Sequence, residues 1–294
     1  MRILLTGGAG FLGSACRQLL AERTDIKVSL LRSGYGPLIP GSRGATFEAP
    51  SSLTAHDLSH EIGAHELSHI IHIGALSSPE VCERDTELAY RSNVRFTEML
   101  ADYAASVGAH LTTVSTDLVF DGAQAPSEGL TEEHATRPIS VYGTTKLLAE
   151  AATLRAPSNS VVRVALLYGH TSSKSQGVLG WMERTFKEGS PLSLFSDEYR
   201  TPIHVADAAQ AILDISKSKL SGIWHCGGPQ RLSRVDFGTL VAQALGYDPA
   251  LIRSTSRLTN ANGPTRPEDV SLNSERLWKT LGRKPRGVIE ALAG

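Results

Sequence analysis

A tyrosine and a lysine, Tyr142 and Lys146, stand four residues apart in a stretch with helical character. Side chains at this spacing lie on the same face of a helix, one turn apart. An ammonium group beside a phenol favours the phenolate and lowers the pKa of the tyrosine. Such a tyrosine can pass a proton to or from a substrate oxygen near neutral pH. The pair predicts acid–base chemistry, although the same pattern also arises by chance in ordinary helices.

Two further polar residues extend this candidate site. Thr116 follows residues 111–115, which we predict to form a central strand, and open α/β sheets bind ligands at the carboxyl ends of their strands. Asn93 interrupts a helical pattern in which asparagine has poor propensity, and it precedes the tyrosine in the order expected if it positions the lysine through a water. A solvent-facing or neighbour-bonded asparagine is the alternative. We predict Thr116, Tyr142, Lys146 and Asn93 as catalytic residues.

A glycine-rich turn near the N-terminus predicts where a cofactor binds. Gly7, Gly10 and Gly13 follow a short apolar strand and open an amphipathic helix. Glycine permits a close approach of the backbone, and the N-terminus of the following helix attracts anions. In this context the turn indicates dinucleotide binding, whereas a glycine-rich turn alone is common. We expect Phe11, Leu12 and Ala75 to contribute to the same cofactor site.

The residues after the second predicted strand, 26–31, indicate which dinucleotide binds. An acidic residue about 20 positions beyond the glycine turn binds the ribose 2′-hydroxyl, and an arginine there suits a 2′-phosphate. The residue at this position is Arg32, and Ser33 can add a hydroxyl donor. We therefore expect NADP(H) to be preferred over NAD(H), with a solvated surface arginine as the alternative.

The order of the predicted elements indicates the fold class. Predicted strands at 2–6, 26–31, around Phe47, 69–75, 111–115 and 160–167 alternate with helices, including a long one from 79 to 105. This alternation predicts an α/β protein with a doubly wound parallel sheet of Rossmann type. We assign residues 1–168, with about 203–227, to a dinucleotide-binding domain. Residues 169–202 and 228–294 are assigned to a smaller C-terminal α/β substrate-binding domain, in which Ser233 is predicted to cap a helix ending at Leu245.

Composition limits the classes of partner. The 294 residues carry a net charge of −1 and no polybasic block, which argues against nucleic acid or an anionic membrane as a partner. No apolar run approaches the ~18 residues of a membrane helix, and the N-terminus enters a strand without a signal peptide. The three cysteines are far apart and odd in number. We expect a cytoplasmic protein, with a homodimer as one option.

Residues 65–69 match the HExxH pattern of zinc proteases. That chemistry requires both histidines on one helix face, but His69 opens a strand-like run that ends at Gly74. We therefore predict no metal site and interpret the match as a chance one.

Four stretches together resemble the extended short-chain dehydrogenase/reductase family, and within it the dTDP-4-dehydrorhamnose reductases. They are Thr6–Gly13, Ser115–Gly122, Tyr142–Lys146, and Arg266-Pro267 followed by Leu272. They span nearly the whole chain, and residues 115–122 are the most specific to the reductase group.

The resemblance implies a role for each matching residue. Tyr142 would protonate the C4 carbonyl oxygen of the sugar as hydride arrives from NADPH, while Thr116 holds that oxygen. Lys146 would bind the nicotinamide ribose and tune Tyr142, and Asn93 would complete the proton relay. Cationic groups suit a diphosphate, because arginine can hold phosphate oxygens bidentately. The resemblance assigns substrate binding to Ser77, Asp117, Arg200 and Arg266, the two arginines holding the diphosphate of a nucleotide sugar.

The sequence departs from the family pattern at two places. Leu118 stands where the reductases usually have tyrosine, and where related dehydratases have the glutamate that serves as base, so dehydration is disfavoured. Ala49-Pro50 replace the usual Asp-Leu after strand three. The sequence predicts an NADPH-dependent ketoreductase for a nucleotide-activated keto-deoxysugar. Its alternatives are a nucleotide-sugar epimerase and a non-catalytic, dinucleotide-binding regulatory subunit.

Overall fold

A parallel sheet organises the computed structural model, which describes residues 1–23, 25–33, 46–49, 67–173, 177–259 and 265–293. The sheet has seven strands in the order β11-β6-β5-β4-β1-β2-β3, and every neighbouring pair is parallel. The strands are β1 (Arg2–Thr6), β2 (Lys27–Ser33), β3 (Thr46–Ala49), β4 (His69–His72), β5 (His110–Thr116), β6 (Ser160–Val164) and β11 (Gly222–Cys226). The predicted doubly wound Rossmann-type fold is confirmed. The strand order reverses between β1 and β4, and such a switch point is where these sheets bind ligands.

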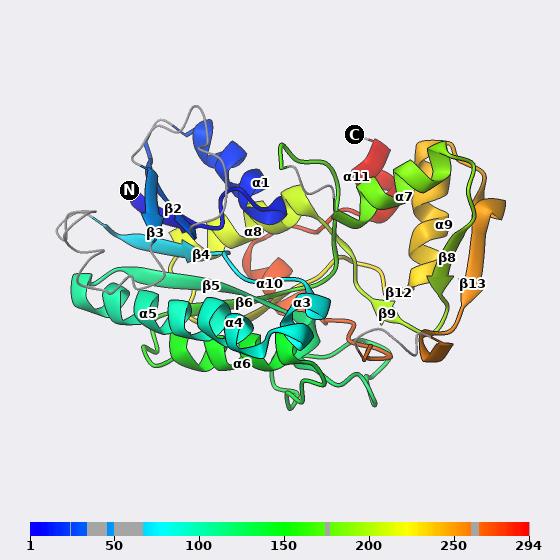
Figure 1. Cartoon of the computed structure of the whole chain (residues 1–294). Helices are drawn as coiled ribbons and strands as arrows, with labels where there is room; N and C mark the ends of the chain where they lie inside the picture. The colour runs from blue at the N-terminus through cyan, green and yellow to red at the C-terminus, as the bar shows by residue number, and fades with distance from the viewer. Residues whose placement is uncertain (24, 34–45, 50–66, 174–176, 260–264, 294) are drawn as a thin grey trace.

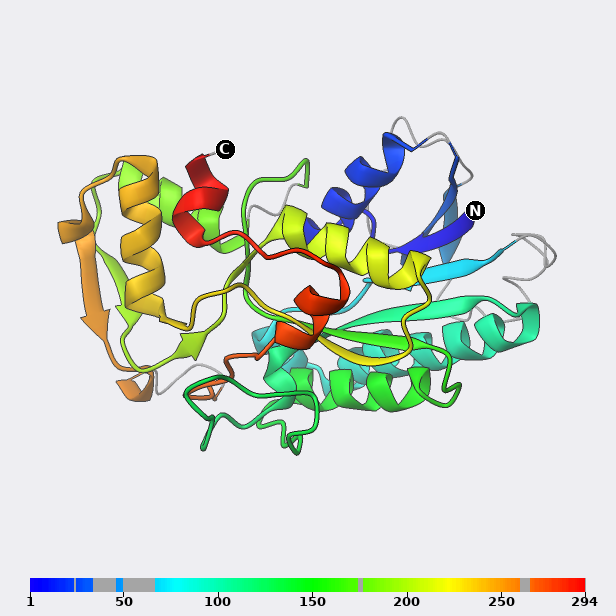
Figure 2. The same ribbon diagram turned by 180° about the vertical axis from the view of Figure 1, so that it is seen from behind.

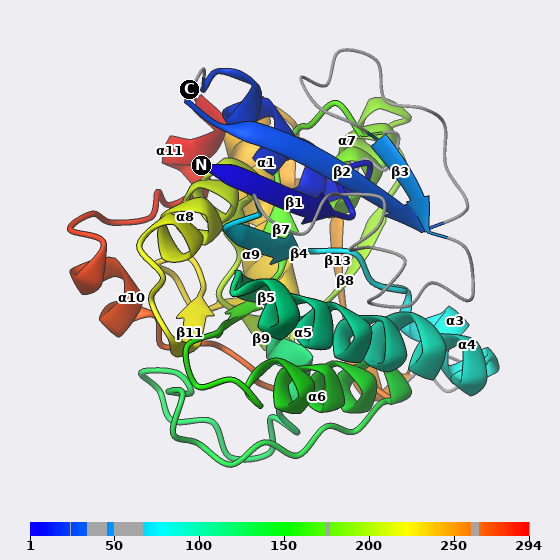
Figure 3. The same cartoon turned by 90° about the vertical axis from the view of Figure 1, so that its left-hand side faces the viewer.

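Helices cover both faces of this sheet. Helices α1 (Phe11–Ala21) and α8 (Val205–Lys217) contact each other on one face, and α5 (Phe96–Val107) and α6 (Val141–Thr153) lie on the other (Figures 1 and 3). Side chains alternate along β1, so that Ile3 and Leu5 join the core under α1 and α8, whereas Leu4 joins the core under α5. Burial on both faces explains the continuous apolar runs of the central strands.

The expectation of one continuous helix over residues 79–105 was wrong. The segment contains α3 (Pro79–Arg84), α4 (Thr86–Tyr90), a π-helical turn η1 (Arg91–Arg95) and then α5. Asp85 leaves the helical region, with φ −135° and ψ 83°, and its carboxylate accepts a hydrogen bond from the amide of Leu88 at 2.9 Å. This side-chain cap ends one helix and starts the next. The π-helical turn carries Asn93, which is completely buried.

The second half of the chain adds a smaller lobe beside the carboxyl ends of the strands (Figures 1 and 2). Ser233 caps α9 (Arg234–Leu245) as predicted, because its hydroxyl accepts from the amide of Asp236 at 3.0 Å and the carboxylate of Asp236 accepts from the amide of Ser233. The lobe has its own apolar core, which includes Phe186, Leu194 and Phe237. Its main elements are α7 (Gly177–Lys187), β8 (Leu192–Phe195), α9 (Arg234–Leu245), β13 (Ile252–Thr255) and α11 (Val288–Ala293).

Short elements connect the two parts. Strand β7 pairs with β10 in parallel, and β9 pairs with β12 in antiparallel orientation. These elements are β7 (Leu167–Tyr168), β9 (Tyr199–Arg200), β10 (Ile203–His204), β12 (Leu232–Ser233), α10 (Glu275–Thr280), and the 3-10 turns η2 (Asp117–Val119), η3 (Pro249–Leu251) and η4 (Arg257–Thr259). Among the described residues, every helix is too short or too polar to cross a membrane.

Candidate active site

A pocket of about 570 Å³ lies at the switch point, between the carboxyl ends of the central strands and the smaller lobe. Most of the residues predicted from the sequence line it, namely Gly7, Gly10, Phe11, Leu12, Gly13, Ala75, Ser77, Thr116, Asp117, Tyr142, Lys146, Arg200 and Arg266. We call it the active-site pocket. Of the other predicted residues, Asn93 lies outside this lining, in the π-helical turn, and Arg32 and Ser33 occupy the last two positions of β2.

The glycine turn forms a tight cradle at one end of the pocket. Gly7 has φ +72°, and a Cβ there would lie 2.5 Å from the amide nitrogen of Gly74. A Cβ on Gly13 would lie 2.0 Å from the carbonyl oxygen of Gly7. Helix α1 has no side-chain cap and no acidic residue in its first turn. Its first amides therefore remain available to an anion, and the turn fits the pyrophosphate of a dinucleotide.

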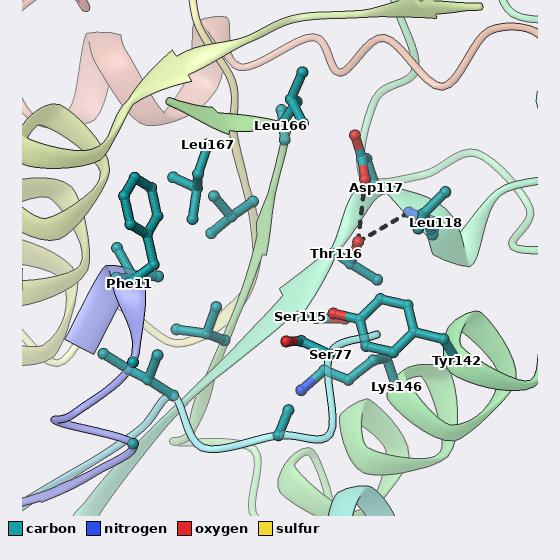
Figure 4. Close-up of a pocket in the computed structure, with 18 of the residues that line it drawn as sticks. Phe11, Ser77, Ser115, Thr116, Asp117, Leu118, Tyr142, Lys146, Leu166 and Leu167 are labelled. Atoms are coloured by element: carbon teal, nitrogen blue, oxygen red, sulfur yellow. Dashed lines mark hydrogen bonds between the residues drawn. The ribbon is translucent and has the colours of Figure 1, made fainter. Parts of the chain in front are cut away.

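Thr116 and Tyr142 meet in the middle of the pocket. Thr116 ends β5, and Tyr142 lies in the first turn of α6, which Ser140 caps by accepting from the amide of Gly143 at 3.1 Å. Figure 4 shows Tyr142 and Lys146 on one side of the pocket and Phe11 on the other. The pocket therefore lies between the glycine turn and the phenol of Tyr142.

The electrostatics of Tyr142 differ from the expectation. Desolvation raises the pKa of Tyr142 well above its usual value, the negative charge of Asp117 raises it further, and hydrogen bonding to Thr116 only partly opposes the rise. The prediction that Lys146 lowers this pKa was therefore wrong for the free protein. The phenol keeps its proton at neutral pH, which suits a proton donor better than a base.

Lys146 is 2% exposed, and burial lowers its pKa to about 8. The carboxylate of Glu150, one turn further along α6, opposes this effect. Glu150 is itself buried, where it accepts a hydrogen bond from Ser115 at 2.5 Å and pairs with Arg163 at 2.7 Å. These contacts fix the Glu150 carboxylate one turn from Lys146, where its charge favours the charged form of the lysine.

Asn93 connects the loop after β4 to helix α6. Its Oδ1 accepts from the amide of Leu76 at 2.8 Å, while its Nδ2 donates to the carbonyl of Leu76 at 3.2 Å and to Thr145 Oγ1 at 3.0 Å. Thr145 directly precedes Lys146 in the chain. The geometry therefore places Asn93 where it positions helix α6, and its part in a proton relay remains a prediction.

A chain of buried hydrogen bonds also links the glycine turn to this asparagine. Thr97 Oγ1 donates to the carbonyl of Asn93 at 2.7 Å, so it must accept from His72 Nε2 at 2.9 Å. His72 Nδ1 then accepts from Thr6 Oγ1 at 2.7 Å, which in turn accepts from the amide of Gly74. Burial lowers the pKa of His72 to about 3, so the ring is neutral. The donors and acceptors thus assign the Nε2–H tautomer.

A cluster of charged side chains closes the other end of the pocket. Arg200 pairs with Asp117 at 2.9 Å and with Glu198 at 3.4 Å, and Glu198 also lies 3.4 Å from Arg266 and 3.9 Å from Arg234. Sequence reasoning missed Glu198 and Arg234. Arg234 directly follows the predicted cap Ser233, but only the pairing of β9 with β12 brings it beside Arg200.

The HExxH match has no support in the described part of the chain. His65 and Glu66 lie outside the described residues, and His69 begins β4 instead of continuing a helix. Within the described ranges, no three histidine, cysteine or acidic side chains gather in a way that could hold a metal ion.

The comparison with protein families gives a clear result. Residues 1–293 match the model of the RmlD substrate binding domain. The chain belongs to this family. A relative of this RmlD-family chain is methionine adenosyltransferase 2 subunit beta of Xenopus laevis, which is 29% identical over 285 residues, covering 95% of this chain and 82% of the relative.

Solved structures agree with the RmlD fold. A dTDP-4-dehydrorhamnose reductase from Clostridium acetobutylicum has a TM-score of 0.83 at 24% identity, covering 100% of this chain and 97% of that one. A second dTDP-4-dehydrorhamnose reductase, from Bacillus anthracis in complex with NADP, has a TM-score of 0.80 at 22% identity, covering 99% of this chain and 96% of that one. MoeE5 in complex with UDP-glucose and NAD scores 0.81 at 23% identity, covering 100% and 96%. At these identities the likeness establishes the shared fold.

Proposed function

We propose that this protein is an NADPH-dependent ketoreductase that acts on a nucleotide-activated keto-deoxysugar. The observation that carries the proposal is the convergence of Thr116, Tyr142 and Lys146 in one pocket with the glycine turn of α1. A scaffold without chemistry would not need these three groups beside a nucleotide cradle. Residues 1–168 with about 203–227 would bind the cofactor, and residues 169–202 and 228–294 would bind the substrate.

The chain's own residues would handle the proton and the orientation of the carbonyl. When bound, the dinucleotide would supply a hydride to the carbonyl carbon. Tyr142 would donate its proton to the carbonyl oxygen, which makes the product a hydroxyl, and Thr116 would hold that oxygen. Lys146 would bind the nicotinamide ribose. Tyr142 is protonated at neutral pH, which is the state that can donate a proton.

The arginines at the far end of the pocket would hold the nucleotide diphosphate. Arg266 is the better candidate, since its side chain is 34% exposed and its contact with Glu198 is 3.4 Å long. Arg200 is buried and already paired with Asp117 at 2.9 Å, so it would support the site more than grip the ligand. The MoeE5 complex with UDP-glucose supports a nucleotide sugar as the ligand of this fold.

The position of Arg32 at the end of β2 supports a preference for NADPH over NADH. We expect Arg32→Asp to lower the NADPH-to-NADH ratio of kcat/KM by about tenfold, roughly 1.4 kcal/mol, because the 2′-phosphate loses a cation and meets an anion. Steady-state rates with both cofactors measure this ratio. The exposed Arg91→Asp serves as control. An unchanged NADPH-to-NADH ratio in Arg32→Asp would show that another group binds the 2′-phosphate.

The lowered pKa of Lys146 predicts how activity depends on pH. Lys146 is charged below pH 8 and loses its proton as the pH rises through about 8, whereas Tyr142 stays protonated over this range. We expect kcat/KM for reduction to fall above pH 8, by about tenfold per unit. In Lys146→Arg the remaining activity should show no such fall. A wild-type profile that stays flat up to pH 9.5 would contradict this role of Lys146.

The relative from Xenopus laevis favours a second candidate, a dinucleotide-binding regulatory subunit, and an epimerase would use the same site. A panel of dTDP- and UDP-linked 4-keto-6-deoxysugars with NADPH separates the three. A reductase consumes NADPH and forms a hydroxyl in equal amounts. An epimerase changes the sugar without net oxidation of NADPH, and a regulatory subunit binds NADPH but converts no sugar. The last two outcomes would each overturn the ketoreductase proposal. A cytoplasmic location and a homodimer remain predictions.

A further inference from the structure

Glu198 lies in an unusual place for a carboxylate, inside the basic end of the active-site pocket. Its side chain is 2% exposed and faces three guanidinium groups. The carboxylate lies 3.4 Å from Arg200 and from Arg266, and 3.9 Å from Arg234. Charge-assisted pairs of good geometry measure about 2.7–2.9 Å, so all three contacts are long. The carboxylate is shared among the arginines and is not held firmly by any of them.

The basic cluster carries more positive charge than its acids neutralise. Arg200, Arg234 and Arg266 contribute three positive charges against the two negative charges of Asp117 and Glu198. Burial lowers the pKa of Arg234 to about 10, Glu198 opposes this effect, and the two neighbouring arginines add to it. Arg234 therefore remains charged at neutral pH, in a position where one positive charge is not balanced.

Two nitrogen atoms of the cluster also lack partners. Among the described residues, the Nε atoms of Arg200 and Arg266 are buried and make no hydrogen bond, and Arg200 is only 7% exposed. Buried guanidinium donors without partners are costly, because they have lost their hydration. Both arginines line the pocket. The unbalanced charge and the unused donors together indicate that this end of the pocket accepts an anion.

We propose that Glu198 is an internal counter-anion which competes with a ligand phosphate for Arg234 and Arg266, and so sets the affinity of the pocket for diphosphates. This inference rests on the proposed function and adds Arg234 as a phosphate-binding residue. Asp117 holds Arg200 at 2.9 Å, so the looser contacts of Glu198 with Arg234 and Arg266 are the ones a phosphate replaces. The two phosphates carry more negative charge than the one carboxylate that they replace as partner of the arginines. The Coulomb attraction is therefore stronger after the exchange, which makes it favourable.

Titration of UDP by calorimetry tests the inference, with saturating NADP⁺ present so that the glycine turn is already filled. Glu198→Gln keeps the shape and one acceptor of the side chain but removes its charge. We expect it to tighten UDP binding about tenfold and to steepen its dependence on salt. Glu268→Gln, which removes an exposed carboxylate paired with Arg257, is the matched control and should leave UDP affinity unchanged.

For a second variant we expect UDP affinity to change in the opposite direction, and this variant keeps the inference testable if Glu198→Gln does not fold. Arg234→Gln should weaken UDP binding about tenfold, while affinity for uridine, which has no phosphate, stays the same in all variants. Weaker UDP binding in folded Glu198→Gln would show that Glu198 orients the arginines instead of competing, and would overturn the inference. So would the absence of UDP binding in every variant. Reduction of a keto-sugar is measured separately, so the ketoreductase proposal stands or fails independently of this result.

Discussion

Tyr142→Phe is expected to slow carbonyl reduction by about 100- to 10,000-fold, the usual contribution of a general acid. The substitution removes only the hydroxyl, so the ring continues to fill its place between Thr116 and the helix. Affinity for NADPH should stay within twofold of wild type, because the phenol acts on the substrate oxygen. Single-turnover reduction with bound NADPH measures the chemical step, and fluorescence of NADPH measures binding.

The matched control for this variant is Tyr103→Phe. Tyr103 lies in α5, is completely buried, and its hydroxyl has no hydrogen-bond partner among the described residues. Removing that hydroxyl should leave both the rate and NADPH binding unchanged. If Tyr142→Phe reduced the sugar as fast as the control, another group would be the proton donor and the proposed mechanism would be wrong.

Gly7→Ala is expected to weaken NADPH binding by about 100-fold, which corresponds to roughly 2.7 kcal/mol. A Cβ at this position would lie 2.5 Å from the amide nitrogen and 2.7 Å from the Cα of Gly74. Both atoms belong to the backbone, so no side chain can move to make room. The turn must open, and the amides at the start of α1 then no longer face the pyrophosphate. Fluorescence titration of NADPH measures the loss.

Gly108→Ala separates this steric effect from backbone strain. Gly108 has φ +68°, close to the +72° of Gly7, but a Cβ there meets nothing within 4 Å. Both variants carry the strain of a left-handed conformation, about 1 kcal/mol, and only Gly7→Ala adds the clash. Equal NADPH affinity in the two folded variants would show that the glycine turn does not hold the cofactor.

Local features of the sequence predicted much of the fold. The apolar runs of β1 and β4, the strand-like residues of β5 and the spacing of Gly7, Gly10 and Gly13 are short-range patterns, and the structure has strands and a tight glycine turn where they occur. The helix over 79–105 was predicted wrongly because its apolar spacing continues through Asp85, whose side chain offers the backbone a competing hydrogen bond.

The protonation states and charge contacts of the site could not be predicted from such short-range sequence patterns. The spacing of Tyr142 and Lys146 correctly placed both on one helix, but it led to the wrong direction for the tyrosine pKa. That pKa depends on burial and on Asp117, which belongs to a different element. Glu198 and Arg234 meet only because β9 pairs with β12.

The amino-acid sequence alone therefore predicted the main strands of the sheet, the glycine turn and most of the side chains that line the pocket, because periodicity and turn preferences act over a few neighbouring positions. Tertiary structure alone decided which charges share the pocket and which protons they keep. Desolvation and Coulomb interactions depend on distance in space, and in this protein they join residues more than 80 positions apart, such as Asp117 and Arg200.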